Sequence, residues 1–154
     1  MWHTVLIALH ALTGTVALVA GCVAHRRLAL FGVYLWSVVA TVTFLAAAVA
    51  EEWARLDTLS RSLFTAFTVL GAVMVRLAFD ARRLPPGSES YVDRVGFTVV
   101  ALFDAFIVIT VLNLGAPVWL VVASGVAVAI AGHFSLRATK AAVRSPAGTV
   151  GARG

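Results

Sequence analysis

Cysteine, lysine and charged residues in general are scarce in this 154-residue chain. A single cysteine, Cys22, excludes an internal disulfide, a CxxC redox pair and any zinc or iron–sulfur site built from the cysteines of one chain. Charged residues make up only 12% of the chain, whereas soluble domains contain about 25%. Lysine occurs once beside abundant arginine, alanine, valine and leucine, a usage associated with GC-rich prokaryotes. The composition therefore argues against a water-soluble domain.

Motifs that identify common enzymes are also missing. The sequence contains no phosphate-binding GxxxxGK(S/T) loop, no GxSxG nucleophile elbow and no HExxH zinc helix. The four histidines have no HxxxH or HxH spacing of the kind that indicates a metal site. The apolar runs described below number five, and five spans cannot divide into the two equal halves of an inverted-repeat transporter. We therefore expect a protein that is not an enzyme and that holds no metal ion.

Long apolar runs dominate what the sequence does contain. Hydrophobic residues make up 61% of the chain and its mean hydropathy is +0.98, and so apolar a chain would expose sticky patches in water. A membrane-spanning helix needs about 20 mostly apolar residues, because its backbone polar groups must be satisfied internally. We predict an all-α bundle of five transmembrane helices over residues 1–137, followed by a flexible basic cytoplasmic tail over 138–154. The predicted spans are residues 2–24, 28–50, 59–79, 92–114 and 118–136.

The charged residues predict the orientation of the bundle. With the N-terminus outside, most basic residues fall on the inner face and only two fall on the outer face. The inner face would carry Arg26, Arg27, Arg82, Arg83, Arg94 and the tail, and the outer face Glu51, Glu52 and Asp57 with two arginines. This positive-inside asymmetry predicts an N-out, C-in protein of the prokaryotic plasma membrane. The formal charge of +5 is therefore a topology signal, and we expect no nucleic-acid partner.

Aromatic residues near the ends of the runs fit the same orientation. Trp2, Trp53 and Trp119 fall at the predicted outer boundary, and Tyr34 and Tyr91 fall towards the inner one. Tryptophan and tyrosine are enriched at the level of the lipid headgroups, so we expect these residues to form two interfacial belts.

The first run has a second interpretation. Its residues Val19-Ala20-Gly21-Cys22 fit a lipoprotein cleavage box, which would make the run a removable signal. A signal needs a basic segment before its apolar part, and Met1-Trp2-His3 contains neither lysine nor arginine. We therefore predict a permanent transmembrane helix.

Asp104 is the most informative polar residue within the runs. It lies about ten residues from either end of the fourth run, close to the bilayer centre. A charge there costs a few kcal/mol or more, so Asp104 is either protonated or paired with a residue of another helix. His10 lies at comparable depth and is our candidate partner, although His10 could instead bond a threonine or a backbone carbonyl. We predict an intramembrane polar site of His10 and Asp104 that is linked to a proton or a small solute.

Small residues form stripes that predict helix packing. Small side chains let the backbones of neighbouring transmembrane helices approach closely. The first run carries such a stripe at helical spacing: His10, Gly14, Ala17, Gly21 and His25. Comparable stripes are Tyr34–Ser37–Thr41, Thr65–Thr68–Ala72–Arg76 and Gly125–Ala129–His133. We expect one polar, small-residue interior, and the surplus of small-residue surface suggests a homo-oligomer or an accessory subunit of a larger membrane complex.

The histidines suggest an alternative function. Haem b held between helices takes two axial histidines at similar depth on facing helices. His25 and His133 both lie near the predicted inner surface, with Gly21 and Gly132 close by in the sequence. The alternative prediction is a membrane electron carrier with His25 and His133 as axial haem ligands.

Part of the chain resembles a known family. The matching series is His10-x3-Gly14-x2-Ala17-Leu18-x2-Gly21, then His25-Arg26-Arg27, Phe31 and Tyr34, with looser similarity at Gly71 and Arg76. Over roughly residues 10–76 it resembles the uncharacterised bacterial membrane proteins of domain of unknown function 2306. The sequence departs from that pattern because it lacks a Lys-Gly-Gly-like turn before His25 and a glycine four residues after it. The resemblance implies a compact helical membrane bundle in which His10 and His25 matter, and it implies no reaction.

Overall fold

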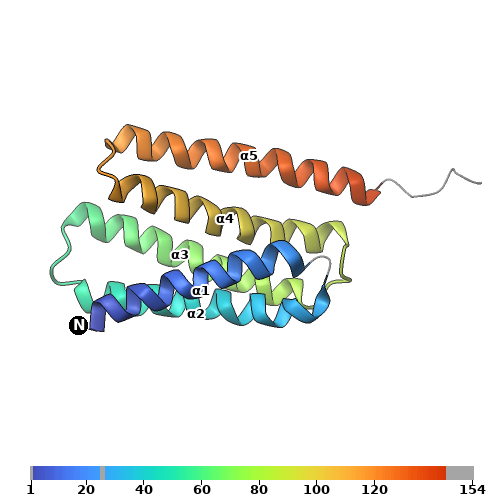
Figure 1. Cartoon of the computed structure of the whole chain (residues 1–154), viewed down its shortest axis with the longest axis horizontal. Coiled ribbons are helices and arrows are strands. Elements are labelled where there is room, and N and C mark those ends of the chain that lie inside the picture. Colours follow the sequence, from blue (N-terminus) through green and yellow to red (C-terminus); the bar gives the residue numbers. More distant parts are fainter. Residues whose placement is uncertain (1, 25–26, 145–154) are drawn as a thin grey trace, which may run out of the picture.

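The computed structural model describes residues 2–24 and 27–144, and Figure 1 shows how their helices are arranged. The described residues form five long α-helices without any strand, and each helix is long and apolar enough to span a membrane. The predicted all-α bundle of five membrane helices is therefore confirmed. The helices are α1 (Trp2–Ala24), α2 (Phe31–Glu52), α3 (Thr58–Ala81), α4 (Glu89–Asn113) and α5 (Val118–Arg144), with a short 3₁₀ helix η1 (Leu28–Leu30) before α2.

The last helix is longer than the sequence predicts. We expected it to end at residue 136, and the structure continues it to Arg144. The added segment is rich in alanine, the best helix former, and contains Lys140, which contacts α4. Residues 138–144 are therefore helix and not flexible tail, while 145–154 lie outside the described residues.

Capping residues and glycines fix where α3 and α4 begin and where α4 ends. The carboxylate of Asp57 accepts a hydrogen bond from the backbone N–H of Ser60 at 3.2 Å, and the hydroxyl of Ser88 accepts one from Tyr91 at 3.3 Å. Gly115, which follows α4, has a φ of 75°, a left-handed conformation that glycine adopts without strain. These short turns make successive helices antiparallel.

The two ends of the bundle differ in charge. We call the end that carries residues 53–57 and 114–117 the acidic end, and the end that carries residues 27–30 and 82–88 the basic end. The acidic end includes Glu51, Glu52 and Asp57 beside Arg55 and Arg61. The basic end includes Arg27, Arg82, Arg83, Arg94, Arg137 and Lys140. The fold thus gathers most basic residues at one end, as the positive-inside pattern requires, and which end faces the cytoplasm stays a prediction.

The buried core belongs to α1–α4 and lies towards the basic end. Within the described part of the chain, α1 packs on α2 and α4, α3 packs on α2 and α4, and α5 packs on α4 alone (Figure 1). The core comes from the second halves of α1 and α3 and the first halves of α2 and α4. Its members are Ala17, Ala20, Tyr34, Leu35, Val38, Met74, Ala78, Ala81, Tyr91 and Val95. Packing is therefore dense at the basic end, and α5 forms an outer layer.

Tyr34 and Tyr91 belong to this core and not to an interfacial belt, so that part of the belt prediction is wrong. Their exposed fractions are 0% and 2%, and both rings pack around Phe31 with centroid distances of 5.6 and 5.8 Å. Gly21 of α1 makes room for the Tyr34 ring, because a Cβ there would lie 3.1 Å from it. The three predicted outer tryptophans are exposed, as the prediction requires.

Candidate functional site

Asp104 lies at the interface between α4 and α5. Its Oδ1 atom is buried and has no hydrogen-bond partner among the described residues. The carboxyl group faces Gly125, where an added Cβ would lie 3.5 Å from Oδ1 and 3.9 Å from Oδ2. The absence of a side chain at Gly125 therefore leaves the space that the carboxyl group occupies.

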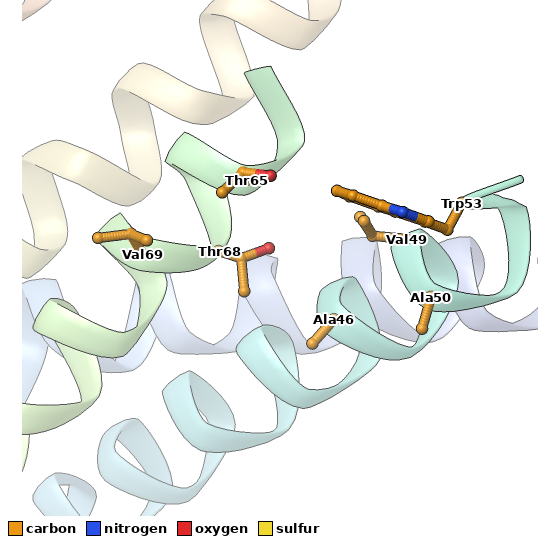
Figure 2. A pocket seen from close by; sticks show the side chains of 7 residues that line it. All are labelled: Ala46, Val49, Ala50, Trp53, Thr65, Thr68 and Val69. Atoms are coloured by element: carbon orange, nitrogen blue, oxygen red, sulfur yellow. The ribbon is translucent and has the colours of Figure 1, made fainter. Parts of the chain in front are cut away.

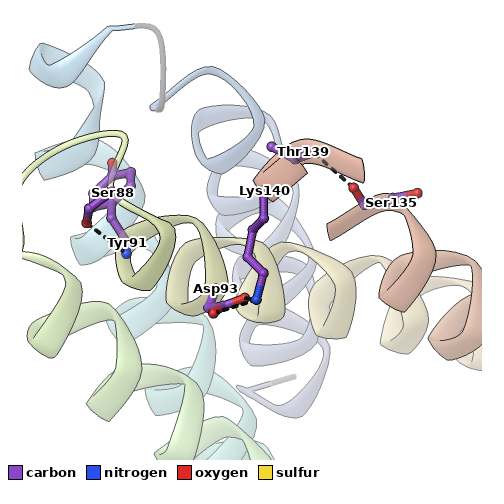
Figure 3. A network of polar contacts seen from close by, with 6 residues as sticks. All are labelled: Ser88, Tyr91, Asp93, Ser135, Thr139 and Lys140. Carbon is purple, nitrogen blue, oxygen red and sulfur yellow. Dashed lines mark hydrogen bonds and ion pairs between the residues drawn. The ribbon is translucent and has the colours of Figure 1, made fainter. Parts of the chain in front are cut away.

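The contacts around Asp104 form a continuous line that we call the α4–α5 seam. At the basic end, Nζ of Lys140 lies 2.9 Å from Oδ1 of Asp93, and Figure 3 shows Lys140 reaching across from α5 to α4. Further along, three glycines each face a larger side chain of the opposite helix. These pairs are Gly96 with Leu136, Gly132 with Val100, and Gly125 with Asp104 and Val108. The seam places Asp104 in an apolar, close-packed stretch between two helices.

His10 lies at a different interface, between α1 and α2. Its Nδ1 is 2.9 Å from the backbone oxygen of Thr41. Because a carbonyl oxygen only accepts hydrogen bonds, Nδ1 must carry the proton, which leaves Nε2 of the neutral ring as an acceptor. The hydroxyl of Thr41 lies 3.0 Å from that of Thr13, so three polar side chains join the two helices here.

No hydrogen bond joins His10 to Asp104, the predicted pair, in the described part of the chain. The structure gives His10 the backbone-carbonyl partner that the sequence left open as the alternative. Asp104 faces α5, a helix that makes no packing contact with α1. The two residues therefore form two separate polar positions within the bundle.

The small residues singled out in the sequence lie at helix interfaces. Gly14 faces the side chain of Thr41, with a 3.5 Å distance from an added Cβ, and Ala17 is fully buried. Gly21 faces Val99 and Tyr34, and Gly125 faces Asp104. These positions bring α1 onto α2 and α4, and α5 onto α4.

Of the two histidines suggested as haem ligands, only His133 lies within the described residues. His133 is exposed on α5, next to the ring of Phe134 at a centroid distance of 5.9 Å. It lies beside the seam and not within it, because Gly132 and Leu136 face α4. His25, like Arg26, lies outside the described residues, so the haem hypothesis stays an untested prediction.

The polar stripe of α3 faces outwards, which corrects the expectation of one shared interior. Thr65, Ala72 and Arg76 are exposed, while Met74 and Ala78 supply the buried face of the helix. The hydroxyl of Thr65 donates to the carbonyl of Arg61 at 2.7 Å, so it needs no partner from another helix. Arg76 likewise pairs on its own helix, with Asp80 at 3.3 Å.

A groove lies between α2 and α3 that the sequence did not predict. It has a volume of about 430 Å³ and lies between the halves of the two helices nearer the acidic end (Figure 2). We call it the α2–α3 groove, and its lining residues are Ala46, Val49, Ala50, Trp53, Thr65, Thr68 and Val69. Sequence patterns could not reveal it, because lipid-facing and protein-facing positions of a membrane helix are both apolar.

No protein-family model, curated protein or solved structure matches the chain. The resemblance of residues 10–76 to domain of unknown function 2306 therefore stays a prediction.

Proposed function

We propose that this integral membrane protein works in the prokaryotic plasma membrane through the carboxyl group of Asp104, which binds and releases a proton inside the bilayer. The protein would take part in a process coupled to a proton or a small solute, either alone or as an accessory subunit of a larger membrane complex. The observation that carries the proposal is the buried Oδ1 atom of Asp104, which has no hydrogen-bond partner among the described residues.

The surroundings of Asp104 favour a proton over a metal ion. An unpaired charge near the bilayer centre costs about 3 kcal/mol or more, so a carboxyl group without a basic partner is more stable there as the neutral acid. In the described ranges, no three side chains of the histidine, cysteine, aspartate and glutamate types gather as metal ligands would. A single carboxyl group suits exchange of a proton.

Exchange of the proton would require α5 to move relative to α4 at Asp104. The seam partner α5 contacts only α4 among the described helices, so a small separation at Gly125 would expose the carboxyl group without disturbing the buried core. His10 offers a second proton-binding atom, Nε2, at the α1–α2 interface. Polar residues within membrane helices commonly serve such proton relays.

Labelling with an apolar carbodiimide tests the proposal. This reagent partitions into hydrocarbon and modifies protonated carboxyl groups, so peptide mapping of the membrane-embedded protein should find the adduct at Asp104. Asp93 is the matched control, because it lies on the same helix in an ion pair with Lys140. Labelling of Asp93 but not of Asp104 would contradict the proposal.

Proton movement is measured separately in liposomes that enclose a pH-sensitive dye. We expect an imposed membrane potential to drive proton uptake by the wild-type protein and by Asp93→Asn, and Asp104→Asn to abolish it. If carbodiimide labels Asp104 and no uptake is seen, the purified chain lacks a transport activity of its own, and the accessory-subunit form of the proposal remains. Uptake that persists in Asp104→Asn would overturn the role of this carboxyl group.

A further inference from the structure

Helices α2 and α3 pack together towards the basic end, where Trp36 contacts Phe79, and diverge beyond a last close contact. The contact is between Val42 and Gly71, where a Cβ on the glycine would lie 2.9 Å from the valine side chain. From this crossing towards the acidic end the two helices separate, as Figure 1 shows, and the α2–α3 groove occupies the space between them. The buried core lies on the other side of the crossing, so it cannot fill the groove.

The groove opens to the hydrocarbon region. Apart from Trp53, its lining residues belong to the segments Phe31–Glu52 and Ser60–Ala81, which are apolar enough to span a membrane. The two threonine hydroxyls in its wall donate to carbonyls of their own helix, Thr65 to Arg61 at 2.7 Å and Thr68 to Phe64 at 2.8 Å. Both threonine donors of the wall are therefore already used, and the remaining lining is mostly apolar, so a hydrocarbon chain suits it better than water does.

A fixed positive charge lies at the mouth of the groove. The guanidinium of Arg61 stacks over the ring of Trp53, with 5.8 Å between its carbon and the ring centroid. Its Nε donates to the carbonyl of Trp53 at 3.1 Å, and one terminal nitrogen lies 3.4 Å from the carbonyl of Ala54. These contacts hold the guanidinium beside Trp53, a lining residue of the groove.

We propose that the α2–α3 groove binds one hydrocarbon chain of a phospholipid, whose phosphate group contacts Arg61. Tryptophan and arginine at a helix end mark the level of the lipid headgroups, so Arg61 meets the phosphate at the depth where the chain enters the groove. A volume of about 430 Å³ lies within the size range of small-ligand sites, which is about 300–1,000 Å³. This site is separate from Asp104, and neither proposal depends on the other.

Filling the groove tests where the chain binds. In Thr68→Leu, a larger apolar side chain projects into the groove. The matched control is Thr15→Leu on α1, an exposed threonine whose hydroxyl also bonds a carbonyl of its own helix, that of Ala11 at 2.9 Å. Native mass spectrometry with added phosphatidylglycerol should show retained lipid on the wild-type protein and on Thr15→Leu. We expect the affinity of Thr68→Leu to fall about tenfold, as loss of a fitted apolar contact predicts.

Two further experiments distinguish the contribution of the lipid's hydrocarbon chain from that of its phosphate group. Diacylglycerol, which has the chains without the phosphate, should bind about fivefold more weakly than phosphatidylglycerol, and inorganic phosphate alone should not bind. Arg61→Gln should lower the affinity for phosphatidylglycerol about fivefold and leave diacylglycerol unaffected. Arg55→Gln is the control, because Arg55 lies at the same end of the bundle but pairs with Glu52 at 3.1 Å.

Three results would overturn the inference. The first is equal lipid retention by Thr68→Leu and the wild-type protein. The second is an equal effect of Arg61→Gln and Arg55→Gln on phosphatidylglycerol. The third is a homodimer of the wild-type protein that only Thr68→Leu dissociates, because the groove would then hold a helix of a second copy.

Discussion

Gly132 of α5 lies against Val100 of α4 so closely that a Cβ at Gly132 would overlap the valine side chain. The same relationship recurs one turn away, where a Cβ at Gly96 would overlap Leu136. Since α5 contacts only α4 among the described helices, these glycines set how closely the last helix can approach the bundle.

Replacing Gly132 by alanine should loosen the seam. The new methyl group forces the helices apart, and overpacking of this kind costs about 1–3 kcal/mol. Gly32 of α2 is the matched control, because no atom lies within 4 Å of a Cβ placed there. Gly32→Ala should leave the free energy of unfolding unchanged or raise it by up to about 1 kcal/mol, since alanine favours helix. Thermal unfolding in one detergent compares the two variants, and equal melting temperatures would contradict a tight seam.

The ion pair between Asp93 and Lys140 should contribute little to stability. Both side chains are partly exposed, with 49% and 27% of their surface accessible, and exposed ion pairs give about 0–1 kcal/mol. We expect a double-mutant cycle of Asp93→Ala and Lys140→Ala to yield a coupling energy in this range. The coupling should shrink in high salt, because added ions screen exposed charges. A coupling well above that range, or one insensitive to salt, would show that the pair is shielded by neighbouring groups.

The two core tyrosines should tolerate loss of their hydroxyl groups. The hydroxyls of Tyr34 and Tyr91 are buried without a hydrogen bond of good geometry among the described residues. The hydroxyl of Thr98 lies near that of Tyr34 without a hydrogen bond of good geometry to it, and it donates to the carbonyl of Arg94 at 3.1 Å. Removing an unpaired buried hydroxyl is neutral or stabilising, so Tyr34→Phe and Tyr91→Phe should each raise the free energy of unfolding by about 0–1 kcal/mol. Their effects should add in the double variant, whereas a shared bridging water would make each variant destabilising and the pair non-additive.

The basic end should face the cytoplasm. In a Cys22→Ser background, Ala54→Cys places a thiol at the acidic end and Pro86→Cys places one at the basic end. A membrane-impermeant maleimide should label Ala54→Cys in intact cells, and Pro86→Cys only after permeabilisation, because basic connections are retained inside. The reverse pattern would show that the bundle is inserted the other way round.

The helices themselves were predictable from the sequence, because bilayer thickness demands long apolar runs and few other sequences supply them. The side of each helix that faces its neighbours was not. Thr65 and Thr68 illustrate the reason: their hydroxyls bond carbonyls of their own helix, so polarity did not force them inwards. In a soluble protein the outward face is polar and the pattern is readable, whereas lipid and protein interior are equally apolar here.

Asp104 shows a related limit. Its unusual position within an apolar run identified it from the sequence, and the structure places it at a helix interface. Its neighbour could not be predicted, because Gly125 contributes no side chain and therefore no chemical signal. The sequence left two partners open for His10, either Asp104 or a threonine or backbone carbonyl, and the structure gives it the carbonyl of Thr41. Depth in the membrane is readable from residue number, but the packing order of helices is not.

The placement of the core within α1–α4 also sets an order of assembly during synthesis. All ten of its members precede residue 96, and α5 begins at Val118. A membrane-inserted chain can therefore complete its buried core while the ribosome is still making the last helix. That helix then joins a finished surface, guided by the glycines of the seam, and Asp104 loses contact with lipid only at this final step.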